Sequence, residues 1–162
     1  MFWIRGRKHW RANAPKDTPT RDDWTGGVTL VVHHTAGLAP FTLEGEVQEM
    51  RGIQRQHQAT NGWNDIGYNY VVMPSGRVYE GRGYGVVGAH TINHNTHTIG
   101  VSFAGNYETA KPTARSLAAY HLLVARLRLK GARITRTTGH RFMPDQATAC
   151  PGKHLVKALR LR

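Results

Sequence analysis

Metal-binding types of side chain stand where several predicted strands and loops end. His33 and His34 close the apolar run VVHH, His140 closes TTGH, and Cys150 lies in TACPG. Two imidazoles and a thiolate form the mixed nitrogen and sulfur set that zinc accepts, and three protein ligands leave a fourth tetrahedral position for water. Because these residues are far apart in the chain, only the fold could assemble them. In the alternative interpretation, backbone groups satisfy the two histidines and Cys150 packs as a small apolar residue.

Predicted strands must carry these residues to one place. The segment VTLVVH (28–33) is β-branched and almost continuously apolar, which is typical of a central strand covered on both faces. We expect two further strands and a hairpin, at 98–105, at 133–140, and over 68–81 with its turn at 74–76.

Apolar residues at helical spacing predict three helices. The first begins after Thr42, the expected N-cap, and its apolar stripe ends at His57, which we expect to be a satisfied core histidine. The second closes with basic residues before Gly131, and the third covers 152–162. Helices that alternate with strands indicate an α/β fold: a single domain with a central mixed β-sheet flanked by helices. A chain of 162 residues has the length of one domain.

The net charge of +12 predicts attraction to a polyanion, which could be nucleic acid, an anionic membrane or an acidic cell-wall polymer. No zinc-finger, helix-turn-helix or aromatic RNA-binding signature accompanies the basic residues, so we expect no specific nucleic-acid partner. The single cysteine cannot form an internal disulfide. We expect a monomer.

The N-terminal segment, residues 1–12, is basic and aromatic, and we expect it to be partly folded onto a main domain of residues 13–162. Phe2, Trp3, Trp10 and several arginines could engage a membrane surface or anionic wall polymers. The segment lacks the uninterrupted apolar stretch of a signal peptide, and no run of the chain reaches the length of a transmembrane helix. We therefore expect synthesis in the cytoplasm.

Five groups of motifs resemble one family. The stretches VVHHTAG, GWNDIGYNYVV, GRVYEGRG, GAHTINHNTHTIGVSFAGNY and TGHR with TACPG occur in the order found in zinc-dependent N-acetylmuramoyl-L-alanine amidases of the phage lysozyme and peptidoglycan-recognition type. The resemblance runs from about Trp10 to the terminal helix. It implies the peptidoglycan-recognition protein/amidase fold and bacterial peptidoglycan as the partner. It also implies one catalytic Zn²⁺ and hydrolysis of the bond between N-acetylmuramic acid and L-alanine by a zinc-activated water.

The resemblance assigns the metal ligands and two catalytic residues. His33, His140 and Cys150 match the family's zinc ligands. Tyr68 and Thr148 match the residues whose hydroxyl groups can stabilise the oxyanion that forms when water attacks an amide carbonyl.

Three further residues match positions in or beside the family's substrate groove: His34, His90 and Asn95. For each of these the alternative is a supporting role, in which His34 orients its neighbours and the other two structure the loop.

The sequence departs from the family pattern at two places. Ser102 stands where one branch has a glutamate that can serve as general base, so we expect that carboxylate to be missing. Phe142 follows GHR where aspartate is common, and Asp145 comes three residues later.

Three functional readings follow from the resemblance. The basic charge and the expected cytoplasmic synthesis favour a phage endolysin, made in the host cytoplasm and acting on the bacterial cell wall. A bacterial muropeptide-recycling amidase is the alternative enzyme. A non-catalytic recognition module is the alternative binding protein, but such members typically lose the cysteine ligand, and Cys150 is present here.

Overall fold

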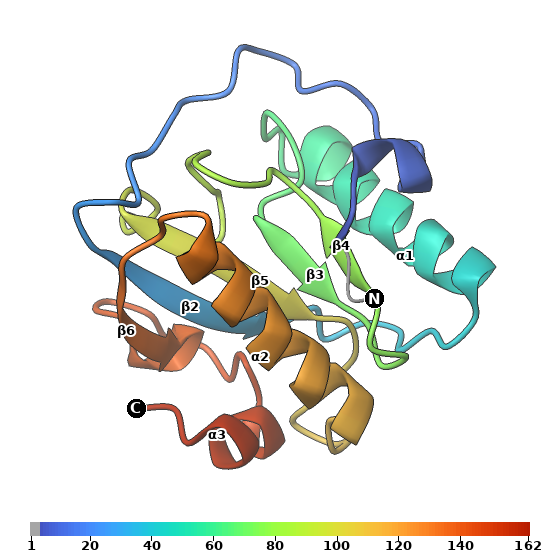
Figure 1. Ribbon diagram of the computed structural model, residues 1–162. Helices are drawn as coiled ribbons and strands as arrows, with labels where there is room; N and C mark the ends of the chain where they lie inside the picture. Colours follow the sequence, from blue (N-terminus) through green and yellow to red (C-terminus); the bar gives the residue numbers. More distant parts are fainter. Residues whose placement is uncertain (1–3) are drawn as a thin grey trace.

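The apolar run that ends in two histidines forms β2 (Val28–His34), inside a six-stranded sheet. It pairs in parallel with β5 (Thr98–Phe103) on one side and with β6 (Ile134–Gly139) on the other. Figure 1 shows the computed structural model, which describes residues 4–162. As predicted, β2 lies in the interior of the sheet, with a partner on each side. The carboxyl ends of β2, β5 and β6 lie at the same edge of the sheet.

The other half of the sheet contains the predicted hairpin. β3 (Tyr70–Val72) and β4 (Val78–Glu80) are antiparallel, and β3 is parallel to β5. A short β1 (Ile4–Arg5) adds a parallel edge next to β4, which gives the order β1-β4-β3-β5-β2-β6. The predicted α/β fold with a mixed sheet is therefore confirmed.

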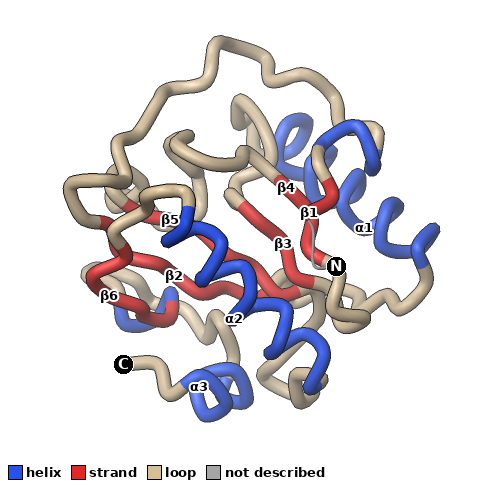
Figure 2. Tube along the Cα trace, in the orientation of Figure 1, coloured by secondary structure: helices blue, strands red, loops and turns tan. Residues whose placement is uncertain are grey.

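Helices cover both faces of this sheet (Figures 1 and 2). α1 (Leu43–Arg55) continues into a π-helical turn at Gln56–Thr60, and α2 (Ala114–Leu129) packs on the opposite face. The predicted N-cap is confirmed, because Thr42 Oγ1 accepts a hydrogen bond from the Gly45 amide at 3.1 Å. α3 (Lys153–Leu159) is shorter than predicted. Arg160 takes a left-handed conformation (φ 51°), which ends the helix and lets Leu161 enter the core.

Strand alternation divides the interior into two cores. Val28, Leu30 and Val32 face α2 together with the alternate residues of β5 and β3. The smaller core lies against α1 and includes Met50, Ile53 and residues of the hairpin. On the α1 side, the facing positions of β2 and β5 hold His33 and Ser102, a register pair, instead of large apolar side chains. This is the part of the sheet where the functional site is built.

Two side chains lie elsewhere than the local pattern indicates. Tyr68 precedes β3, which begins at Tyr70, so the residue lies in a loop and not on the predicted strand. Glu46, in the first turn of α1, is fully buried and accepts hydrogen bonds from Tyr79 and Arg77 of the hairpin at 2.9 and 3.0 Å. It therefore fastens α1 to the sheet.

From residue 4 onward the N-terminal segment is part of the fold. Trp10 is buried and its Nε1 donates to the Glu80 carbonyl at 2.8 Å. Arg7 forms an ion pair with the buried Asp65 at 2.8 Å, which anchors the loop that precedes Tyr68. Phe2 and Trp3, predicted to engage a surface, lie outside the described residues. Within residues 4–162 no helix is both long and apolar enough to span a membrane.

His57, on the π-helical turn after α1, is a satisfied buried histidine as predicted. Its Nδ1 accepts a hydrogen bond from the Gly67 amide at 2.9 Å, and its ring stacks at 4.7 Å on Trp63. Burial, with a smaller effect of Arg82, lowers the pKa of His57 to about 4. The neutral ring is therefore the form that the fold stabilises.

We predict that His57 makes the metal-free protein sensitive to mild acid. An unfolded histidine has a pKa near 6.5, so the unfolded state binds more protons between pH 6.5 and about 4. The free energy of unfolding should fall over this range, by up to about 3 kcal/mol from this residue alone. His57→Asn retains an acceptor near the Nδ1 position but does not titrate, so urea unfolding of the variant should show a shallower decline. Equal slopes for the two proteins would refute the assignment.

Candidate metal centre

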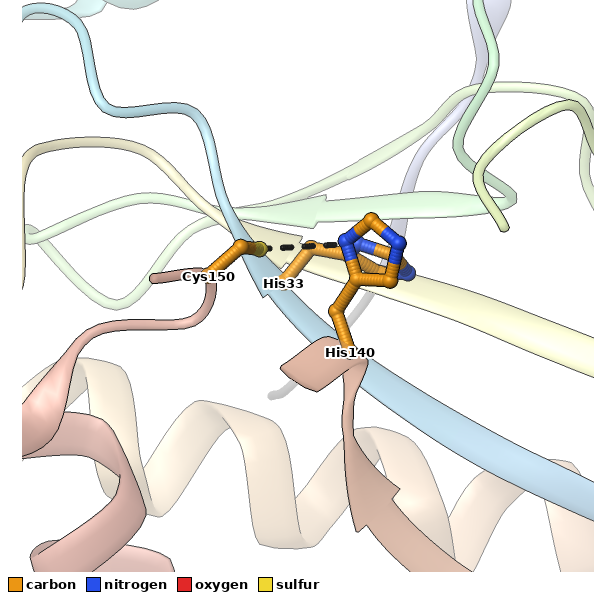
Figure 3. Close-up of side chains that lie close together, drawn as sticks. All are labelled: His33, His140 and Cys150. Carbon is orange, nitrogen blue, oxygen red and sulfur yellow. Dashed lines mark hydrogen bonds between the residues drawn. The ribbon is translucent and has the colours of Figure 1, made fainter. Parts of the chain in front are cut away.

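Three potential metal ligands from distant parts of the chain meet at the carboxyl edge of the sheet. His33 lies near the end of β2, His140 begins the 3-10 turn that follows β6, and Cys150 lies in the turn before α3. Their ligand atoms all lie within 4.8 Å of one another, and His33 Nδ1 is 3.7 Å from Cys150 Sγ (Figure 3). The parallel pairing of β2 with β6 brings the first two together, because both strands end at this edge.

His33 is held by a second histidine beneath it. Its Nε2 lies 3.0 Å from Nδ1 of His90, whose own Nε2 lies 3.4 Å from Thr98 Oγ1. The Thr98 hydroxyl donates to backbone carbonyls, so it can only accept from His90. We infer that His90 carries its proton on Nε2 and accepts at Nδ1, both from His33 and from the Thr91 hydroxyl 3.0 Å away. This network protonates His33 at Nε2 and leaves its Nδ1 lone pair facing the cluster.

The His90 ring occupies space that two glycines leave open. A Cβ on either Gly88 or Gly100 would overlap this ring. Burial lowers the pKa of His90 to about 3, with smaller contributions from His140 and Arg82. The ring is thus neutral, buried and fixed in the tautomer that orients His33.

A glutamine orients the second imidazole in the same way. His140 Nε2 lies 3.0 Å from Gln146 Oε1, and the amide nitrogen of this glutamine donates to the carbonyls of Ile92 and Pro144, each at 3.1 Å. The amide oxygen must therefore accept from His140, which leaves the Nδ1 lone pair free. Sequence reasoning missed Gln146, because nothing local marks an amide six residues after a ligand as its support.

The Cys150 sulfur accepts a hydrogen bond from the His34 backbone amide at 3.4 Å. Burial raises the pKa of this thiol to about 12, against smaller opposing effects of the His34 amide and Arg141. A thiolate at neutral pH therefore requires a cation close by. The His34 ring lies toward the other face of the sheet, where its Nδ1 accepts from the Tyr107 amide at 3.1 Å.

The donor set fits Zn²⁺. Burial lowers the pKa of His33 and of His140, and His90 and His140 lower that of His33 further, so both rings are in the neutral form that binds metals. Two imidazole nitrogens and one sulfur face a common point, and each imidazole has its other nitrogen engaged. Three protein ligands are the number found in catalytic zinc sites.

A hollow of about 290 Å³ surrounds the three ligands and contains both predicted catalytic residues. Burial raises the pKa of Tyr68, so its phenol is neutral and can donate a hydrogen bond. Thr148 Oγ1 accepts from the Cys150 amide at 3.1 Å, which leaves its hydroxyl proton free to donate. Trp63, which sequence reasoning did not single out although it lies in the quoted GW motif, contributes a partly exposed ring to the wall.

The three predicted substrate-binding residues are all engaged by the protein itself. His34 supports the loop at Tyr107, and His90 lies beneath His33 with only 7% of its surface exposed. Asn95 Oδ1 accepts from the amides of His90 and Thr91 at 2.8 and 3.0 Å. These contacts give each residue a supporting role, and their contact with substrate stays a prediction.

No carboxylate lines the hollow within the described residues. Ser102 is fully buried on β5 at the position paired with His33, so the predicted departure from a glutamate leaves a hydroxyl there. Asp145 and Phe142 are both exposed and do not line the hollow.

Comparisons with known proteins identify the family of this chain. A family model described as N-acetylmuramoyl-L-alanine amidase matches residues 27–153. Peptidoglycan-recognition protein SC2 of Drosophila melanogaster is 38% identical over 132 residues, which cover 80% of this chain and 71% of that protein. A human N-acetylmuramoyl-L-alanine amidase is 40% identical over 136 residues, covering 81% of this chain and 23% of the human protein.

Two solved structures share the fold. The ectodomain complex of peptidoglycan recognition proteins LCa and LCx, bound to tracheal cytotoxin, contains a chain that superposes with a TM-score of 0.91 and 35% identity. That alignment covers 99% of this chain and 95% of the other. Peptidoglycan recognition protein LE, bound to the same monomeric diaminopimelic acid-type peptidoglycan, gives a TM-score of 0.88 and 33% identity, covering 97% and 92%.

We predict that His90 sets the metal affinity of the site through His33. His90→Leu removes the acceptor for His33 Nε2 and should weaken Zn²⁺ binding about 10–100-fold, as measured by competition with a chromophoric chelator. His90→Asn keeps an acceptor near the Nδ1 position and should restore much of the affinity. If both variants lose affinity equally, the effect comes from the lost ring volume and not from the hydrogen bond.

Proposed function

Because the chain belongs to the N-acetylmuramoyl-L-alanine amidase family, we propose that it hydrolyses the amide bond between N-acetylmuramic acid and the L-alanine of the peptidoglycan stem. The observation that carries the proposal is the complete ligand set, His33, His140 and Cys150, with each imidazole already oriented by a partner. A recognition module would need only the hollow that binds the ligand. It would not need a largely buried thiol that lies beside two oriented imidazole rings.

The residues around the ligands suit attack on an amide carbonyl. When bound, Zn²⁺ supplies a Lewis acid that polarises a carbonyl and makes water more acidic. Tyr68 and Thr148 can both donate hydrogen bonds to the oxygen that gains negative charge, because burial keeps the Tyr68 phenol neutral by raising its pKa and the Thr148 hydroxyl proton is free. The cation, when bound, and these two hydroxyl groups would stabilise the oxyanion. No carboxylate lines the hollow within residues 4–162, so no acidic side chain there is placed to act as general base.

Peptidoglycan is the substrate class that the relatives support. The recognition proteins LCa, LCx and LE were solved with tracheal cytotoxin, a peptidoglycan fragment. The hollow in this chain is open to solvent, and the partly exposed ring of Trp63 could pack against a sugar or a stem peptide.

We propose further that the activity is lytic and directed at the polymeric wall, as in a phage endolysin made in the host cytoplasm. The net charge of +12 supports this, because a cationic enzyme accumulates on an acidic polymer. A recycling amidase acts on small free muropeptides and gains little from such a charge.

The proposal predicts a defined product. Purified peptidoglycan should release stem peptides with new L-alanine amino termini, identified by mass spectrometry, and a zinc chelator should stop their release. Cys150→Ala removes one ligand and should do the same, whereas excess Zn²⁺ should restore the chelated wild type and not the variant. Binding of the protein to intact sacculi without any such peptides would instead favour the recognition module.

Tyr68→Phe should separate catalysis from metal binding. Loss of one oxyanion donor is expected to lower kcat about 10²–10³-fold, while the Zn²⁺ content per chain stays that of the wild type. The ring remains, so the fold should be unchanged by circular dichroism. A variant that keeps full kcat, or one that loses its metal, would contradict the assigned role.

A further inference from the structure

The positive charge is concentrated in the last third of the chain. Residues 111–162 contain twelve Lys and Arg and one acidic residue, Asp145, whereas residues 1–110 contain ten basic and nine acidic residues. Most of the basic excess therefore lies in this last third of the chain, on and around α2, β6 and α3. The N-terminal segment, where we expected a surface contact, adds four basic residues and no acidic one. None of these twelve side chains takes part in an ion pair within the described residues.

The outer surface of α2 carries an apolar stripe. Ala118, Leu122, Ala125 and Leu129 are spaced by four, three and four residues, so they lie in one line along the helix. All four are exposed to solvent, and Leu122 and Leu129 are 49% and 89% exposed. The buried residues of α2, such as Leu123 and Leu127, occupy the opposite side. Folding of the domain thus leaves this stripe uncovered.

Basic residues flank the stripe on both sides. At 100° per residue, Arg115 and Arg126 fall on one side of it, and His121 and Arg128 on the other. All four are exposed. An apolar line between two basic borders is the pattern of a helix that lies in the plane of a membrane interface, with leucines among the acyl chains and arginines at the phosphates.

A basic groove continues this surface toward the C-terminus. It has a volume of about 530 Å³ and lies between the start of α2, the segment before it, and α3. Three ammonium groups and an apolar floor line it: Lys111, Lys153 and Lys157, with Pro112, Leu117 and Ala158. In Figure 1, α3 lies beside the N-terminal half of α2. We call the stripe, its borders and this groove the basic face.

We propose that the basic face binds the surface of an anionic phospholipid bilayer, with α2 lying in the interface. The lysines of the groove and the arginines of the borders would meet the phosphate groups, and each basic residue adds to the attraction near such a surface. His33 and the hollow lie on the α1 side of the sheet, whereas α2 covers the other side. A chain bound in this way keeps its hollow open on the side away from the lipid.

The basic face suits lipid better than two other occupants. A second copy pairing through the same stripe would bring the arginines of the two borders against each other, and like charges at such a contact repel. Nucleic acid would use the charges but would leave Leu122 and Leu129 without an apolar partner. Only a surface with both anionic groups and an apolar layer accounts for the stripe and its borders together.

Vesicle co-sedimentation tests the proposal on the full chain. Vesicles of phosphatidylcholine alone are compared with vesicles of equal parts phosphatidylcholine and phosphatidylglycerol. We expect binding to the anionic vesicles only. Arg115→Gln with Arg128→Gln should weaken this binding about tenfold or more. Leu122→Gln with Leu129→Gln should weaken it by a similar factor. Leu129→Trp should add a tryptophan emission that shifts to the blue on the anionic vesicles.

The matched control is a second exposed apolar pair with acidic neighbours. Leu38 and Phe41 are 75% and 63% exposed and lie close to Glu44 and Glu49 in the chain, so Leu38→Gln with Phe41→Gln should leave vesicle binding unchanged. All substituted residues are exposed, and thermal melting should confirm that each variant folds.

Three results would overturn the proposal. These are equal binding to neutral and anionic vesicles, loss of binding in the control pair, and full binding by the leucine variant, which would mean that charge alone attracts the protein. If analytical sedimentation showed a dimer, and the leucine substitutions made it dissociate, the stripe would instead be the contact with a second copy of the chain. None of these outcomes depends on amidase activity, so the lipid contact and the proposed reaction can fail separately.

Discussion

A hydrogen bond between two buried imidazoles, from His33 Nε2 to His90 Nδ1, fixes which nitrogen of His33 faces the ligand cluster. This hydrogen bond is effective because both rings are buried away from water. Burial keeps both rings neutral and makes a ring nitrogen without a hydrogen-bond partner energetically costly. Thr98 fixes the proton of the second ring, and Gln146 performs the corresponding task for His140. The sheet supplies the positions of the ligands, but these polar contacts supply their orientation, and a metal site needs both.

The sequence predicted structure well where a pattern repeats over a few neighbouring residues. It could not predict contacts between residues that are far apart in the chain. The apolar run before His33 located β2, and strand alternation explains the adjacent pair: His33 faces the α1 side, whereas His34 faces the α2 side and supports Tyr107. Family motifs identified the ligands, which spacing alone could not. Gln146 was missed because a turn brings it to His140, and nothing in the local pattern around Glu46 indicates that this carboxylate is buried against Arg77 and Tyr79 of the hairpin.

The sheet also separates two kinds of chemistry. Its α1 side holds the buried, neutral histidines of the ligand cluster, and twelve of the 22 Lys and Arg residues lie in residues 111–162, on and around α2 and α3. A net charge for the whole chain predicts attraction to polyanions but does not locate the charge. The surface contact expected of Phe2 and Trp3 stays a prediction, because these two residues lie outside the described part of the chain. Arg7 and Trp10 of the N-terminal segment hold the loop before Tyr68 and the edge of the sheet.

The space around His90 has an evolutionary consequence. Gly88 and Gly100 are distant from each other in the chain, yet neither can gain a Cβ while the imidazole is present. Loss of the ring would remove this overlap at both positions, although a Cβ at Gly88 would still lie 3.1 Å from the Gly67 carbonyl oxygen. A methyl group gained at Gly100 would then prevent the ring from returning. Changes at these three positions are therefore easier to make than to reverse. A lineage that loses His90, the hydrogen-bond partner of His33, can fill the space with apolar side chains. To restore the candidate metal centre, every one of those changes would have to be reversed first.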